Sequence, residues 1–150
     1  MPFLAPFFLV IMTMFFSVAA TRIDTDRTSA AQAHAANVGA SLLAYRNWVS
    51  EYAVANPQVV GAVSDAALNL PSWFRKNPRI GNYVDSSRGY VYYVPEGARI
   101  PLASLLESGL EVPTLQMGIA RSGSLFHPHV GSTGIALPTA IPEGSIVFVL

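Results

Sequence analysis

The N-terminal residues form an apolar stretch that most constrains the fold of this chain. No ionisable side chain occurs from Phe3 to Thr21, and four charged residues then follow within positions 22–27. A helix needs about 20 apolar residues to cross about 30 Å of hydrocarbon. The pattern therefore predicts a transmembrane anchor over residues 1–21. The side chains expected to face lipid are Phe3, Leu4, Phe7, Phe8, Leu9, Val10, Ile11, Met12, Met14, Phe15, Phe16 and Val18.

A cleaved secretion signal is the alternative interpretation of this stretch. The small residues at 18–20 would suit a signal peptidase site. However, no Lys or Arg precedes the apolar run, and no Gly or Pro occurs between Phe7 and Gly39 to interrupt a helix. These features favour a retained anchor followed by one domain over residues 22–150. Arg22 and Arg27 follow the anchor, which under the positive-inside rule weakly favours a cytoplasmic C-terminal side.

The chain is poor in charge and has no cysteine. Charged residues make up 12% of it, against about 25% in typical soluble proteins, which suits a surface buried against lipid or partner subunits. Lys plus Arg equal Asp plus Glu at nine each, so no net charge attracts nucleic acid, and nucleic acid is not an expected partner. Without cysteine, disulfides, thiolate metal sites and cysteine nucleophiles are excluded.

Residues 28–55 are predicted to be helical, because their apolar side chains recur at alternating spacings of four and three. Asn56 and Pro57 end this helix, since the residue before proline avoids the helical conformation. These apolar side chains form a stripe along one face of the helix, and we expect the larger residues of the stripe to pack the helix on a sheet. These residues are Leu42, Tyr45, Val49 and Tyr52. Trp48 lies off the stripe, where it could pack on the flank or contact a partner.

The remaining sequence predicts turns and antiparallel strands. A helical turn is expected to begin at Ser64, a β-hairpin to occupy residues 82–94 with a loop over 85–89, and a short helix to cover 101–108. A strand is expected over 114–121, a loop over 122–134, and a final apolar strand over 144–150 that is central or protected at its edge. The predicted fold is therefore α+β, with a long N-terminal helix packed on a small antiparallel sheet.

Sequence motifs for catalysis or metal binding are weak. His127 and His129 offer two imidazoles, whereas zinc needs three or four ligands, and the nearby Ser122 and Ser124 lack a nucleophile-elbow pattern. We therefore expect no catalytic, cofactor-binding or metal-binding residues and no enzymatic activity. The rival interpretation is a secreted hydrolase or metal-binding domain with a cleaved signal that uses Ser124, His127 or His129.

Two tryptophans are candidates for a partner surface. Trp73 lies in "LPSWFRKNPRIGNY" beside three cations, which are too few for nucleic-acid binding on a neutral chain. Tryptophan often dominates the energy of protein interfaces. We therefore expect Trp48 or Trp73 to contact a partner protein.

The apolar leader, the helix ending "LLAYRNWVSEYAVANP", the segment "GAVSDAALNLPSWF" and the terminal "IPEGSIVFVL" together resemble the PilM family of plasmid-encoded type IV (thin) pilus conjugation systems. The resemblance implies a non-enzymatic, single-pass inner-membrane protein with a periplasmic C-terminal domain, opposite to the charge-based orientation. It also implies protein–protein contact at the pilus base. The expected partners are other type IV pilus assembly proteins, membrane lipid around the anchor, and further copies of this chain.

Type IV pilins also have an apolar N-terminal helix that packs on a sheet, so the expected fold is pilin-like. The chain departs from pilins in two respects. No basic leader ends in Gly before a Phe, and no Glu lies five residues into the apolar stretch. A minor pilin-like subunit is therefore the alternative to an assembly protein.

Overall fold

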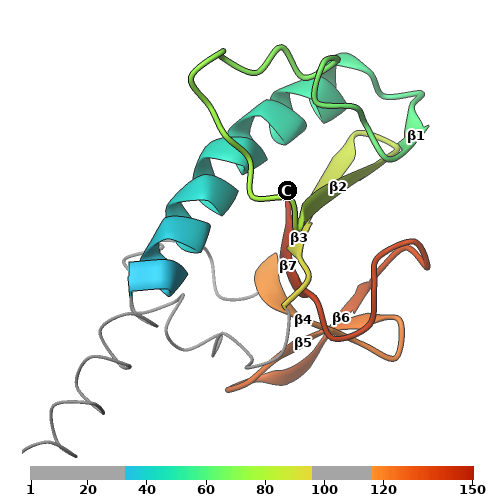
Figure 1. Ribbon diagram of the computed structural model, residues 1–150. Coiled ribbons are helices and arrows are strands. Elements are labelled where there is room, and N and C mark those ends of the chain that lie inside the picture. The colour runs from blue at the N-terminus through green and yellow to red at the C-terminus, as the bar shows by residue number, and fades with distance from the viewer. Residues whose placement is uncertain (1–32, 96–115) are drawn as a thin grey trace, which may run out of the picture. The chain divides into compact units, whose positions relative to one another are not determined.

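The computed structural model describes residues 33–95 and 116–150, which form an α+β arrangement of one helix and a seven-stranded antiparallel sheet (Figure 1). The helix covers residues 33–55. The strands are β1 (Val60–Gly61), β2 (Ile80–Asp85), β3 (Arg88–Tyr93), β4 (Met117–Arg121), β5 (Ser124–His127), β6 (Gly131–Ala136) and β7 (Ile146–Val149). The predicted anchor over 1–21 and the predicted helix over 101–108 lie outside the described residues. Among the residues that are described, no helix has the length and apolar character needed to span a bilayer.

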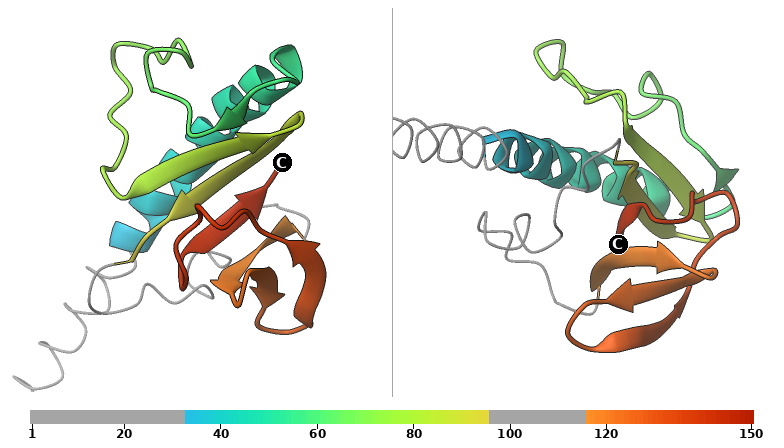
Figure 2. Two further views of the ribbon diagram at one scale, coloured as in Figure 1. Left: turned by 90° about the vertical axis from the view of Figure 1, so that its right-hand side faces the viewer. Right: turned by 60° about the horizontal axis from the view of Figure 1, so that its bottom comes forward.

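The helix buries one face against β2, β3 and β7, and the two views in Figure 2 show it lying across β2 and β3. The fully buried positions on this face are Ala35, Val38, Leu42, Tyr45, Val49 and Ala53. Tyr52 packs at the margin of this cluster and is half-buried. A helix has 3.6 residues per turn, so a stripe drawn with a period of 3.5 drifts, and after two heptads position 53 faces the core better than position 52.

The C-terminal end of the helix is capped by Asn56. Its backbone N–H and its side-chain Nδ2 both donate to the carbonyl oxygen of Tyr52 at 2.9 Å. These bonds satisfy a carbonyl that the last helical turn leaves without a helical partner. Pro57 follows and prevents the helix from continuing.

The sheet has the strand order β1-β2-β3-β7-β4-β5-β6, with every neighbouring pair antiparallel. Strand β7 lies at its centre between β3 and β4, and all four of its residues are buried. The prediction that the apolar C-terminal segment forms a central or protected strand is therefore confirmed. The sheet is larger than predicted because β1, β5 and β6 add strands that the sequence did not reveal.

Alternation along the strands gives the sheet two buried faces. In β3, Val91 and Tyr93 join the helix-side cluster, whereas Tyr90 joins a second cluster on the opposite face. The second cluster is closed by residues of the β6–β7 connection. Its buried members are Tyr90, Ala120, Leu125, Leu137, Ile141, Val147 and Val149.

The prediction of a loop over residues 122–134 is wrong, because β5 and most of β6 form there. Ser122 and Gly123, with φ of 50° and 71°, make the tight turn between β4 and β5, a conformation that suits two-residue hairpin turns. The Glu143 carboxylate accepts a hydrogen bond from the Ser122 N–H at 2.9 Å. These strands contain several Gly, Ser and His residues, so they form through pairing with neighbouring strands rather than through strong intrinsic propensity. The β2–β3 turn is also tighter than predicted, since only Ser86 and Ser87 separate the two strands.

Candidate interaction surface

The connection between β1 and β2, residues 62–79, carries the candidate site. After β1, a turn begins at Ser64, whose carbonyl oxygen accepts a hydrogen bond from the Ala67 N–H at 3.0 Å. Val63 and Leu68 are buried and belong to the helix-side cluster. The connection is therefore packed on the domain by its own apolar side chains before it reaches Trp73.

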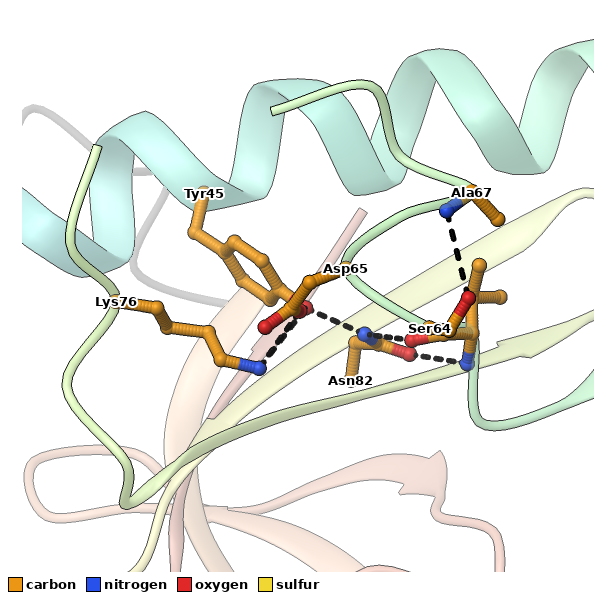
Figure 3. Close-up of polar contacts among 7 residues, drawn as sticks. Tyr45, Ser64, Asp65, Ala67, Lys76 and Asn82 are labelled. Carbon is orange, nitrogen blue, oxygen red and sulfur yellow. Dashed lines mark hydrogen bonds and ion pairs between the residues drawn. The ribbon is translucent and has the colours of Figure 1, made fainter. Parts of the chain in front are cut away.

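A buried asparagine fixes the start of this connection (Figure 3). Asn82, on β2 and 5% exposed, accepts a hydrogen bond from the Val63 N–H at 2.7 Å and donates to the Val63 carbonyl oxygen at 2.8 Å. Its Nδ2 also donates to the hydroxyl of Tyr45, which is fully buried on the helix. One amide side chain thus joins the helix, the sheet and the connection.

An ion pair closes the same network. The Tyr45 hydroxyl donates to Asp65 Oδ1 at 2.8 Å, and Lys76 Nζ contacts the same oxygen at 2.7 Å. The Lys76 ammonium also lies 5.0 Å from the centre of the Tyr45 ring, within the range of a cation–π contact. Although partial burial opposes it, hydrogen bonds from Lys76 and Tyr45 lower the pKa of the Asp65 carboxyl. Residues 63, 65 and 76 are therefore all tied to Tyr45 or Asn82.

Phe74 joins the two tryptophans that the sequence singled out. Its ring stacks on Tyr45 with 6.3 Å between centroids, and it meets Trp48 edge-on at 4.8 Å. It also contacts Trp73 edge-on at 6.0 Å. Trp48 is half-buried on the helix flank, whereas Trp73 is 72% exposed. The structure therefore places Trp48 as a support and Trp73 at the surface.

The Tyr45 network is suited to holding a loop rather than to proton transfer. Burial raises the pKa of the Tyr45 hydroxyl well above its usual value, with Asn82 acting in the opposite sense and Asp65 adding to the rise. A phenol that stays protonated at neutral pH cannot act as a general base. Lys76 is occupied by its ion pair with Asp65.

The histidines of the rival hydrolase or metal interpretation lie elsewhere, at the β5–β6 turn. His127 is buried, and its Nδ1 accepts a hydrogen bond from the His129 N–H at 3.3 Å. Along β5 the buried residues are Leu125 and His127, so Ser124 faces the other side of the strand. Within residues 33–95 and 116–150, no three His, Cys, Asp or Glu side chains gather as a metal site would require.

Sequence reasoning missed four residues of the site: Asp65, Phe74, Lys76 and Asn82. For Asn82 a signal was available, because the alternation of Ile80, Asn82 and Val84 places the amide on the buried face of a strand. A buried amide must find hydrogen-bond partners. For the other three residues the partners lie on the helix or across the connection, and local pattern does not reveal them.

The chain is similar to one protein family and to two solved structures. A family model described as PilM matches residues 9–149. A crystal structure named as that of a PilM protein from Escherichia coli B7A shares the fold, with a TM-score of 0.57 and 23% identity over 79% of this chain and 92% of that chain. Another, named as that of a pilM protein from Pseudomonas aeruginosa 2192, is 37% identical over 77% of this chain and 92% of that chain, with a TM-score of 0.46. No curated protein matches significantly. Because the family model spans nearly the whole sequence, the chain belongs to the PilM family.

Proposed function

We propose that this protein is a non-enzymatic component of a type IV pilus assembly and conjugation apparatus. Residues 1–21 anchor it in the bacterial inner membrane, and residues 22–150 contact other assembly proteins in the periplasm at the pilus base. Membership of the PilM family supports a pilus-related role. The observation that carries the contact function is Trp73, which is exposed on a connection held at residues 63, 65 and 76.

The energy available from Trp73 is sufficient for such a role. A tryptophan buries 150–250 Å² in an interface, and about 25 cal/mol is gained per Å² of apolar surface removed from water. Covering the exposed part of Trp73 therefore contributes about 3 kcal/mol of transfer free energy, from which the costs of association are subtracted. Because Phe74 and the polar network already hold the loop, little conformational freedom is lost on binding.

Trp73→Ala tests this contact in the full-length protein. We expect capture of at least one pilus component to fall by about tenfold or more, because an interface anchor is removed. Val130→Ala is the matched control, since Val130 is 57% exposed on the β5–β6 turn. The melting temperature of both variants should stay close to wild type. Capture of every pilus component at wild-type levels by Trp73→Ala would show that this surface is not used.

Membrane extraction tests the location. A retained anchor requires detergent for release and leaves the mature polypeptide at full length. Release by high salt, or a mature polypeptide that starts at Thr21, would instead support a cleaved signal. Recovery of the protein in sheared pilus fibres would favour the minor pilin-like subunit over an assembly protein.

A further inference from the structure

We propose that Trp73 and Arg75 together recognise an acidic segment of a partner protein that places an apolar side chain next to a carboxylate. This inference rests on the proposed contact function and gives the partner surface its chemistry. Trp73 offers an exposed aromatic face, and Arg75 offers a guanidinium two residues further along the chain. Both residue types are enriched among those that dominate interface energy.

Arg75 is available to a partner. It is exposed, and it pairs with no carboxylate within the described ranges 33–95 and 116–150. Its neighbour Lys76 differs, because that ammonium is already bound to Asp65 at 2.7 Å. The segment 71–79 contains cations and no acidic residue. Its charge is therefore complementary to an acidic partner, and the exposed Arg75 guanidinium can bind a carboxylate in a bidentate manner.

The backbone on both sides of Arg75 is fixed. Phe74 packs between Tyr45 and Trp48, and Lys76 is held by Asp65. A guanidinium presented from a fixed backbone loses less entropy on binding than one on a mobile loop. Trp73 is likewise supported by its edge-on contact with Phe74. The backbone that carries both side chains is therefore held in place, which favours binding by reducing the entropy lost when a partner orders the loop.

A protein partner is favoured over an anionic lipid surface. Lipid recognition by charge uses clusters of about 4–8 cations, each contributing about 1 kcal/mol. The segment 71–79 has three cations, fewer than such a cluster, and the ion pair with Asp65 neutralises one of them, Lys76. So few cations give weak attraction to a membrane, whereas a single Arg–carboxylate pair beside a buried tryptophan can define a protein contact.

Overlapping synthetic peptides from the extramembrane parts of the other pilus assembly proteins provide the probe, with the full-length chain immobilised in detergent. We expect the bound peptides to contain Asp or Glu next to an apolar residue. Arg75→Glu and Trp73→Ala should each weaken binding by about tenfold or more, and Arg75→Lys should retain part of it. Arg88→Glu is the control, because Arg88 is an exposed arginine at the end of the β2–β3 turn. Added NaCl should weaken wild-type binding and leave Arg75→Gln less affected.

Several outcomes would overturn the inference. One is binding of neutral or basic peptides only, and another is an equal loss of binding in Arg75→Glu and Arg88→Glu. Absence of peptide binding also overturns the inference, and Trp73-dependent binding to vesicles of anionic lipid would then identify a lipid surface as the ligand. Capture of intact pilus components by the wild-type chain is measured in parallel. Capture that persists in Arg75→Glu overturns this inference alone, whereas no capture by wild type overturns the proposed function itself.

Discussion

Tyr45→Phe isolates the polar network, because it removes one hydroxyl from a fully buried ring and leaves the apolar packing in place. The hydroxyl accepts a bond from Asn82 Nδ2 and donates to Asp65 Oδ1 at 2.8 Å. Asn82 keeps its two bonds to Val63 in the variant. The second Nδ2 hydrogen of Asn82, however, then lies buried without an acceptor.

The expected cost follows from these contacts. A buried donor left unsatisfied costs about 1–3 kcal/mol. Loss of the bond to Asp65 adds about 0.5 kcal/mol, since the half-exposed carboxylate can bind water instead. We therefore expect the free energy of unfolding to fall by about 2–3 kcal/mol. For a domain of this size the melting temperature should fall by roughly 5–10 °C.

Urea denaturation of wild type and Tyr45→Phe gives the difference. Tyr52→Phe is the matched control, because Tyr52 lies half-buried on the same helix and its hydroxyl bonds no residue that the structure describes. That control should change stability by less than about 0.5 kcal/mol. In a double-mutant cycle, Tyr45→Phe and Asn82→Ala should be coupled by about 1 kcal/mol. Equal effects of Tyr45→Phe and Tyr52→Phe would refute the view that the network fastens the connection.

Further predictions concern pH, packing and turn geometry, each measured by urea denaturation. Although partial burial opposes the change, hydrogen bonds from Lys76 and Tyr45 lower the pKa of the Asp65 carboxyl. The stabilising effect of Asp65 is therefore present above pH 3.8 and is lost as the pH falls further. Asp65→Asn should flatten this acid limb of the curve of stability against pH. Gly118→Ala should destabilise by about 3 kcal/mol, because its Cβ would lie 2.6 Å from the Phe126 carbonyl oxygen. Replacing Ser86-Ser87, with φ of 49° and 70°, by Asn-Gly should stabilise by about 1 kcal/mol. An unchanged acid limb, a stable Gly118→Ala or a weaker Asn-Gly variant would contradict these accounts in turn.

The local sequence pattern was sufficient to predict an element where one of its faces is buried along its whole length. The spacing of Leu42, Tyr45 and Val49 identified the helix face that packs on the sheet, since burial there follows the helical period. The uninterrupted apolar run of β7 indicated a strand covered on both faces. The exposed position of Trp73, by contrast, followed from no periodicity.

Local pattern failed where pairing decides the structure. Strands β5 and β6 contain Ser124, His127, Gly131 and Gly134, which are not among the strong strand formers, and their pairing includes a register shift. The residues of the candidate site could not be predicted from the sequence for a related reason. Tyr45 lies 20 residues from Asp65 and 37 residues from Asn82 in the sequence, so only the packing of the helix on the sheet brings these side chains together.

The polar residue at position 82 is explained by the point where the chain leaves the sheet. Strand β1 pairs with β2 through Val60 opposite Asp85 and Gly61 opposite Val84. Continuing this register would place Val63 opposite Asn82, but β1 has already ended. The amide of Asn82 replaces the missing strand partner by bonding both the N–H and the carbonyl of Val63, two backbone groups whose burial without partners would be costly. This substitution lets the chain leave the sheet edge without unpaired backbone groups, so that it can cross the helix and present Trp73. An apolar side chain at position 82 would fill the same space, yet it would leave Val63 unsatisfied and the connection without its first point of attachment.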